Sequence, residues 1–166
     1  MSSGKVHDFA GKATVGATLP IAVVYLPVDL AICYGLFSIL GFTHLGPDLD
    51  SNNFRANTIR RWGRAKWLWY PFNRLVSPHR GPTHVPLLGA ALVLFWLLLL
   101  TGAVGLIAVM NGWVSLPSFE VRWLWYLFVA FVAVAIQHVV HLAFDGYRLC
   151  QVAVGVGGAV VLGMIL

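Results

Sequence analysis

Residues 85–110 read VPLLGAALVLFWLLLLTGAVGLIAVM and contain no charged side chain. A helix needs about 20 consecutive apolar residues to cross the hydrocarbon core of a bilayer. This stretch is therefore predicted to be a membrane-spanning helix, and it decides the class of fold.

The rest of the chain has the same character. Hydrophobic residues make up 59% of the 166 residues and charged residues only 10%, whereas about 25% of the residues in a soluble domain are charged. This composition excludes an ordinary soluble protein. The net charge of +5 does not indicate a nucleic-acid partner, because so apolar a chain would not stay in solution as a free nucleic-acid-binding module. The length favours one domain, residues 1–166.

Four further apolar segments follow the same pattern, namely residues 13–28, 30–43, 121–144 and 149–166. We therefore predict an all-α fold, a polytopic transmembrane helix bundle with about five membrane-embedded helices.

Residues 13–43 contain three features that disrupt a helix, Pro20, Pro27 and Asp29. Proline is unfavourable inside a helix, and aspartate is a preferred N-cap. The pattern favours two helices joined by a tight turn, with Asp29 capping the second helix. One long, broken span is the alternative.

Residues 44–84 differ from the spans, because they hold most of the basic residues and a row of aromatic ones. Between Trp62 and Val76, tryptophan and leucine stand beside arginine and lysine. This mixture is typical of an interfacial helix at the level of the lipid headgroups, here interrupted at Pro71.

The basic residues also predict the orientation. If all five segments cross the membrane, ten of the 11 lysines and arginines lie on one side, and only Arg122 lies on the other. The ten are Lys5, Lys12, Arg55, Arg60, Arg61, Arg64, Lys66, Arg74, Arg80 and Arg148. Such a bias marks the cytoplasmic side. We expect an integral protein of a bacterial-type inner membrane, with its N-terminus in the cytoplasm and membrane lipids as partners. A homo-oligomer is also compatible with the sequence.

The same side collects side chains that bind metals. Five of the six histidines and four of the six acidic residues fall on it or near it, and His138 lies one helical turn deeper. A metal site needs nitrogen and oxygen ligands from several elements. We therefore predict a divalent-cation site, with Zn²⁺ as the favoured ion and Mn²⁺ or Fe²⁺ as alternatives. The predicted ligands are His7, Asp48, Asp50, His79, His84, His138, His141 and Asp145.

The strongest local pattern is formed by His138, His141 and Asp145, which stand at i, i+3 and i+7 and so share one helix face. Ionisable residues in a span usually face the bundle interior or a water-filled cavity. A structural alternative is that a histidine bonds to a neighbouring helix and that Asp145 pairs with Arg148 or caps the turn.

Two loop patterns are weaker. Asp48 and Asp50 directly follow the second span and can present two carboxylates to one cation, but a solvated helix end gives the same pattern. His79 and His84 flank a Gly-Pro turn. Arg80 lies between them, and its planar guanidinium can bind a phosphate or carboxylate through two hydrogen bonds.

Five short motifs stand in order between residues 4 and 145. They are Gly4-Lys5-Val6-His7-Asp8, Gly46-Pro47-Asp48-Leu49-Asp50, the segment from Arg61-Trp62-Gly63 to Tyr70-Pro71, His79-Arg80-Gly81-Pro82-Thr83-His84, and His141-x-x-x-Asp145. Their order resembles a family of small integral-membrane metal-binding proteins related to the bacterial inner-membrane metal-dependent hydrolases. The hydrolase branch has a serine where this chain has Val85. The order of ligands is also similar, more distantly, to that of zinc-dependent phospholipase C and the P1-type nucleases.

The resemblance implies a metal-dependent hydrolase, and the more distant similarity implies a phosphoester substrate. A site at the headgroup level, among arginine and tryptophan, favours a lipid-type anionic amphiphile. In this interpretation Asp50 binds metal or steers the attacking water, and Arg80 binds the anionic group of the substrate. The alternative is a non-catalytic metal-binding membrane protein with a structural or assembly role. A metal transporter fits less well, because the outer halves of the spans are nearly free of polar groups.

Overall fold

The computed structural model describes residues 4–50, 56–76, 81–115, 118 and 120–165, and the backbone alone at residues 4–5, 158 and 160–165. All regular structure in these ranges is helical, so the predicted all-α class is confirmed. The α-helices are α1 (Gly4–Tyr25), α2 (Val28–Thr43), α3 (Asn57–Arg61), α4 (Tyr70–Leu75), α5 (Pro86–Met110), α6 (Arg122–Phe144) and α7 (Arg148–Ile165). Three 3-10 helices accompany them, η1 (Pro47–Asp50), η2 (Gly63–Trp69) and η3 (Pro82–His84).

The predicted turn at Pro27 is present between α1 and α2, but the capping role predicted for Asp29 is wrong. The N-cap of α2 is Pro27, and no side chain caps the helix. The Asp29 carboxylate instead accepts a hydrogen bond of 2.5 Å from Arg122 Nη2 and another from the Tyr126 hydroxyl. The aspartate therefore joins α2 to α6. Pro20 does not break α1, which runs through it.

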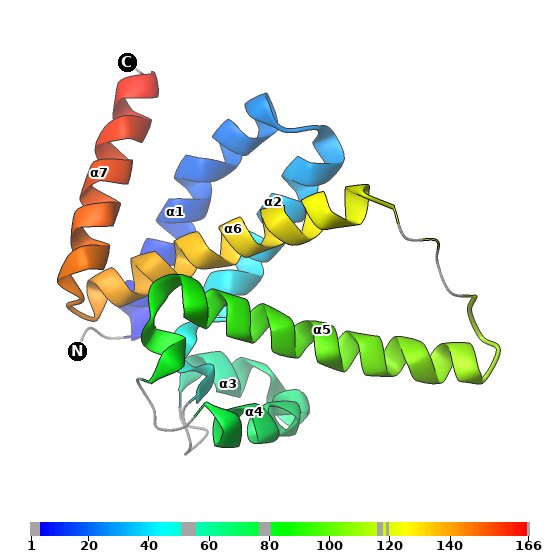
Figure 1. The fold of residues 1–166 in the computed structure, drawn as a ribbon. Helices are drawn as coiled ribbons and strands as arrows, with labels where there is room; N and C mark the ends of the chain where they lie inside the picture. Colours follow the sequence, from blue (N-terminus) through cyan, green and yellow to red (C-terminus); the bar gives the residue numbers. More distant parts are fainter. Residues whose placement is uncertain (1–3, 51–55, 77–80, 116–117, 119, 166) are drawn as a thin grey trace.

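Two helices in the described part of the chain, α5 and α6, are long and apolar enough to cross a membrane. The prediction of five spans is therefore not supported in full. α2 has only 16 residues, and the first turns of α1 contain charged residues. Several side chains of α7 lie outside the described residues. Figure 1 also shows α5 and α6 running across the direction of α1, α2 and α7, so the long helices do not form one parallel bundle.

α5 and α6 differ in how much protein covers them. In the most apolar part of each helix, 56% of the residues of α6 are buried but only 6% of those of α5. α6 packs against α2 through small or branched side chains such as Val129, Ala130 and Ala133. α5 lies outside this pair, and most of its apolar surface contacts no other part of the described chain.

The segment from α3 to α4 contributes side chains to the hydrophobic core, while Trp67 and Leu75 in it are exposed. Its predicted position at the membrane interface stays a prediction. Ile59, Trp69 and Phe72 are almost fully buried against Leu49 of η1 and against α5 and α6. The Trp96 indole donates a hydrogen bond of 3.1 Å to the carbonyl oxygen of Leu68, which ties α5 to this segment. Pro71 lies in the first turn of α4, where a proline does not break the helix.

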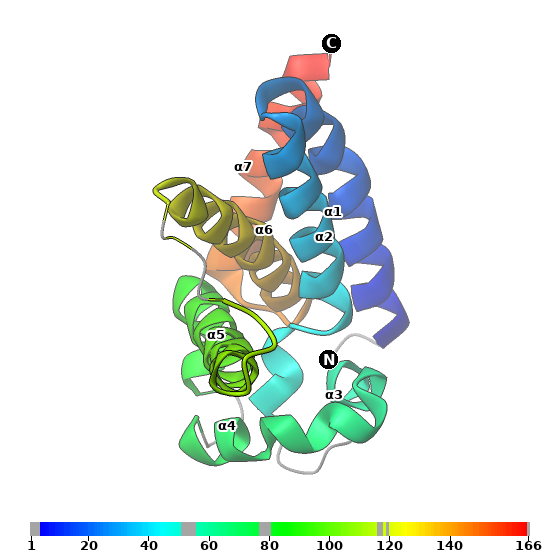
Figure 2. The same cartoon turned by 90° about the vertical axis from the view of Figure 1, so that its right-hand side faces the viewer.

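The N-terminus of α1, the α3–α4 segment and the loop between α6 and α7 lie at one end of the molecule (Figures 1 and 2). α1 and α2 lie side by side, and α6 crosses them. The Asp29–Arg122 contact marks the opposite end of α6. This arrangement brings residues from the beginning and the end of the sequence together.

Candidate metal centre

Five of the predicted ligands meet where four segments converge. His7 comes from the first two turns of α1, Asp48 from η1 and His84 from η3. His141 lies in the last turn of α6, and Asp145 is the C-cap of that helix.

The separations between these side chains suit a shared cation. His141 Nε2 lies 3.4 Å from Asp48 Oδ2 and 3.5 Å from Asp145 Oδ2, and His7 Nε2 lies 3.3 Å from Asp145 Oδ1. These distances exceed the usual hydrogen-bond range of about 2.7–3.2 Å. Two ligands bound tetrahedrally at 2.0–2.2 Å from Zn²⁺ are about 3.3–3.6 Å apart by geometry. The nitrogen and carboxylate donors therefore fit a divalent metal ion.

The potential ligand atoms form two groups, in each of which all atoms lie within 4.8 Å of one another. One group is His7, His141 and Asp145, and the other is Asp48, His84 and Asp145. The rings of His7 and His141 are stacked, with centroids 4.1 Å apart, and a ring nitrogen of each faces the Asp145 carboxylate.

His84 is held from behind by Asp50 and Thr83. The Thr83 hydroxyl donates a hydrogen bond of 2.5 Å to Asp50 Oδ2, and that oxygen lies 3.6 Å from His84 Nδ1. All three side chains are buried. The Thr83 hydroxyl also lies 3.3 Å from His84 Nδ1 and so connects this nitrogen to Asp50. A hydrogen-bond partner on one ring nitrogen orients the other nitrogen for a metal, and His84 Nε2 lies 3.8 Å from Asp48 Oδ1.

The geometry therefore places Asp50 behind a ligand, and it belongs to neither of the two groups of ligand atoms. Its predicted role as a direct ligand is not supported by this arrangement. Thr83 was missed by the sequence reasoning, although it lies inside the His79–His84 motif and could have been found as a hydroxyl next to a candidate ligand.

Gly89 allows η3 to approach α5. A Cβ atom at this position would lie 2.0 Å from the carbonyl oxygen of Thr83, which is far inside van der Waals contact. Only glycine therefore permits the close packing that holds Thr83 and His84 in place. The glycine was not singled out in the sequence, because an apolar span tolerates glycine for many reasons.

The turn after α6 fixes Asp145. The amide of Gly146 donates to the carbonyl of Ala143, and the amide of Tyr147 donates to the carbonyl of Leu142. Gly146 has φ +93°. These two bonds and the left-handed residue constitute a Schellman motif, which places the Asp145 carboxylate beside His7 and His141.

His138 has a different environment from the other histidines. It is fully buried, and its Nε2 lies 2.7 Å from the carbonyl oxygen of Leu45. Because a carbonyl can only accept, Nε2 carries the proton and ties α6 to the end of α2. His138 belongs to neither group of ligand atoms, and this bond agrees with the structural alternative, while the predicted ligand role of His138 stays a prediction.

Two other polar residues near the centre also have partners of their own. His44 Nδ1 lies 2.8 Å from the Thr43 hydroxyl, and its ring packs edge-on against Trp62. Asp8 accepts a hydrogen bond of 2.5 Å from Arg61. The predicted ligand His79 and the predicted anion-binding Arg80 lie outside the described residues.

Exposure decreases from Asp48 to the residues behind it. The Asp48 side chain is 31% exposed, that of His84 2% and that of Asp50 0%. Burial raises the pKa of Asp48, but the neighbouring His141 and His84 lower it by more, so the net pKa lies below the usual value. The carboxylate is thus ionised at neutral pH, as a metal ligand requires.

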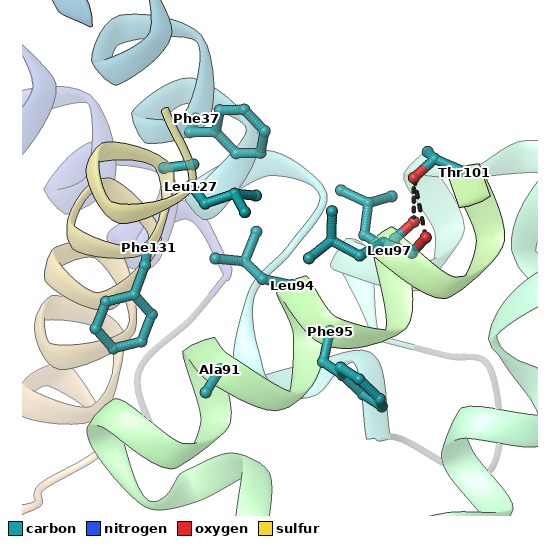
Figure 3. A pocket seen from close by; sticks show the side chains of 10 residues that line it. Phe37, Ala91, Leu94, Phe95, Leu97, Thr101, Leu127 and Phe131 are labelled. Atoms are coloured by element: carbon teal, nitrogen blue, oxygen red, sulfur yellow. Dashed lines mark hydrogen bonds between the residues drawn. The ribbon is translucent and has the colours of Figure 1, made fainter. Parts of the chain in front are cut away.

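A separate cavity of about 310 Å³ lies between α5, α6 and α2. Its walls are apolar apart from Thr101, whose hydroxyl bonds to carbonyls of its own helix (Figure 3). The buried residues Ala90 and Val134 lie on the same two helices between the cavity and the metal-binding residues. The cavity is therefore separate from the histidine and aspartate cluster.

A curated protein of Aquifex aeolicus (strain VF5), named only as an uncharacterized protein, is 43% identical over 72 residues, which are 43% of this chain and 49% of that protein. The chain thus matches about half the length of this relative. No solved structure matches significantly.

A family model described as "Uncharacterized metal-binding protein (DUF2227)" matches residues 2–162. This match covers nearly the whole chain, including every residue of the histidine and aspartate cluster. The prediction of a metal-binding protein is confirmed at this level, and the chain belongs to this family of uncharacterized metal-binding proteins.

Proposed function

We propose that the protein is a membrane-embedded, metal-dependent hydrolase that acts on a phosphoester or lipid-type amphiphile at the cytoplasmic membrane interface. One observation carries this proposal. A partly exposed carboxylate, Asp48, lies beside a histidine, His84, whose second nitrogen faces the buried pair Asp50 and Thr83. The potential ligands are rigidly supported on one side and accessible on the other, as a catalytic metal requires.

Membrane embedding is supported by the exposed face of α5. Side chains such as Phe95, Leu99 and Val104 are about half exposed or more, and so large an apolar face is unfavourable in water. Exposed apolar residues on α1 and α2, such as Phe9, Val24 and Ile32, lead us to place these helices in the bilayer too. Local thinning of the bilayer accommodates short helices, and tilt accommodates helices that cross at an angle.

The cytoplasmic orientation and an anionic substrate are supported by the surface of the α3–α4 segment. Residues 56–76 contain five basic and no acidic side chains. Arg60, Arg64 and Arg74 are exposed, and Arg74 lies over the ring of Tyr70 at 5.3 Å. Basic and aromatic side chains of this kind attract anionic headgroups at the cytoplasmic leaflet.

A divalent cation, when bound, acts as a Lewis acid and lowers the pKa of a bound water toward neutrality. The protein residues have separate tasks. Asp48, His84, His141, Asp145 and His7 would supply the metal ligands, and Asp50 acts through Thr83 to keep His84 in one orientation and tautomer. Arg80 binds the anionic group of the substrate. The apolar part of an amphiphile packs against α5, where the 310 Å³ cavity also opens.

The second candidate is a non-catalytic protein in which the metal has a structural or assembly role. The number of available donors favours it, because two carboxylates and three histidines are enough to close a four-coordinate site. The two candidates differ in whether a reacting group can reach the metal.

The test is a hydrolysis assay on protein reconstituted in vesicles. Phospholipids, isoprenoid phosphates and chromogenic phosphodiesters serve as substrates, with Zn²⁺, Mn²⁺ or Mg²⁺ added. We expect turnover that Asp48→Ala abolishes and that Arg80→Ala lowers by about 100-fold without loss of bound metal. His44→Ala is the matched control, because His44 bonds to Thr43 instead of facing the cluster. Metal binding without turnover of any substrate would favour the structural role.

A further inference from the structure

We propose that the centre binds two divalent cations, bridged by the carboxylate of Asp145. This inference rests on the metal centre of the proposed function but does not depend on hydrolysis. One cation lies among His7, His141 and Asp145, and the other among Asp48, His84 and Asp145.

The potential ligand atoms fall into two groups. Donor atoms bound to one cation at 2.0–2.2 Å are at most about 4.4 Å apart, even when they lie on opposite sides of it. The five side chains fall into two sets of three that meet a similar limit, and Asp145 is common to both. They form two adjacent ligand sets and not one shell of five.

The directions of the carboxylate oxygens agree with two adjacent sets. Both oxygens of Asp145 face histidines of the first set, Oδ1 toward His7 at 3.3 Å and Oδ2 toward His141 at 3.5 Å. Asp48 divides its oxygens between the sets, with Oδ1 toward His84 at 3.8 Å and Oδ2 toward His141 at 3.4 Å. Asp48 can therefore connect the two cations in addition to Asp145, which is common to both sets. In two-metal sites the cations are typically about 3.5–4 Å apart.

The charge of the ligands also favours two cations. Histidines bind metals as neutral ligands, so among the proposed ligands only Asp48 and Asp145 carry negative charge, one unit each. These charges would neutralise a single divalent cation and leave little attraction for an anion. Two cations would leave two positive charges, which an anionic oxygen of a phosphate or carboxylate group can balance. With three protein donors each, both cations also keep coordination positions for that ligand.

The test counts the metals and measures whether they interact. Purified protein is stripped with a chelator, dialysed against Mn²⁺ or Zn²⁺, and analysed by elemental mass spectrometry. We expect two ions per chain. In the Mn²⁺ form, electron paramagnetic resonance should show the multiline spectrum of a magnetically coupled pair, not the six-line spectrum of an isolated ion.

Single substitutions assign each ion to its ligand set. His7→Ala and His84→Ala should each reduce the content to one ion per chain and remove the coupled signal. Asp145→Asn should weaken both sites and reduce the content below that of either histidine variant. His44→Ala should keep two coupled ions. Circular dichroism and gel filtration in detergent confirm that each variant is folded.

The outcomes separate this inference from the proposed function. A parent protein that binds one ion, with no coupled signal, overturns the two-cation centre but leaves a single metal site intact. Complete loss of metal in both histidine variants, while each stays folded, likewise indicates one shared site and overturns the inference. A parent protein that binds no divalent ion overturns the metal centre itself, and with it the proposed function.

Discussion

At the scale of single residues, Gly89 is the position where one methyl group has the largest predicted effect. Gly89→Ala places a Cβ atom against the Thr83 carbonyl, so we expect it to destabilise the protein by about 1–3 kcal/mol and to weaken metal binding. Gly102→Ala on the same helix is the matched control. No atom lies within 4 Å of a Cβ atom there, and alanine is the better helix former. Thermal unfolding in detergent and metal titration measure both effects, and equal behaviour of the two variants would contradict the packing argument.

A second residue-scale prediction concerns the support of His84. Asp50→Asn preserves size but replaces a carboxylate that orients the histidine, so we expect metal affinity to fall by about 10–100-fold. Thr83→Val, which removes the hydroxyl that donates to Asp50, should have an effect in the same direction. Isothermal titration with Zn²⁺ measures both. An unchanged dissociation constant in both variants would show that the buried pair does not position the ligand.

The sequence allowed a large part of this centre to be predicted. The helical spacing of His141 and Asp145 was visible, because i and i+4 share a face whatever the tertiary structure. The same rule could not distinguish His138 from His141. The packing of α6 against α2 sets the rotation of α6 about its axis. That rotation decides which ring faces the Leu45 carbonyl and which ring faces the carboxylates.

At the scale of an element, the end of α6 connects helix termination to metal binding. Gly146 has φ +93° directly after Asp145. We expect Gly146→Ala to lower the free energy of unfolding by about 1 kcal/mol, because residue 146 has a left-handed backbone. The variant should also lower metal affinity by displacing the Asp145 carboxylate.

Gly112→Ala is the control, because Gly112 also has positive φ (+69°) but follows α5. It should lower stability to a similar degree and leave metal affinity unchanged. Chemical denaturation and metal titration of both variants test this, and equal loss of affinity would show that the effect is global.

The sequence pattern predicted the ends of the helices more accurately than it predicted which side chains are buried. α5 begins and ends within a residue of the predicted span 85–110, because a long apolar run bounded by proline and asparagine has few alternatives. The burial of Trp69 and Phe72 was not predicted. Aromatic residues among basic ones are equally typical of the membrane interface and of a core, and only contacts with distant segments decide between these environments.

At the scale of the whole molecule, the distribution of charge predicts orientation. Ala65 lies in η2 on the basic segment, and Ser115 follows α5. In a variant without Cys33 and Cys150, we expect Ala65→Cys to be protected from an impermeant thiol reagent in intact cells and Ser115→Cys to react. Both cysteines should react after the membrane is permeabilised. The reverse pattern in intact cells would place the metal centre on the outer side.

The five-span architecture was the least predictable property. Hydropathy measures how apolar a segment is but contains no information on the angle between helices. Side-chain packing sets that angle, as in the crossing of α6 over α1 and α2 (Figure 2). A short helix such as α2 satisfies the sequence pattern of a span without having the length of one.

The sequence separation of the ligands has a consequence for the order in which the protein is made. His7 lies on α1, and Asp145 follows α6, so five α-helices of the described chain separate the two residues in the sequence. His7 therefore cannot meet its carboxylate partner until α6 has been synthesised. Contacts between such distant residues form late, because a long chain segment must first be brought together. Metal loading consequently follows the synthesis of α6 and of the turn after it, and any factor that delivers the ion must act after that point.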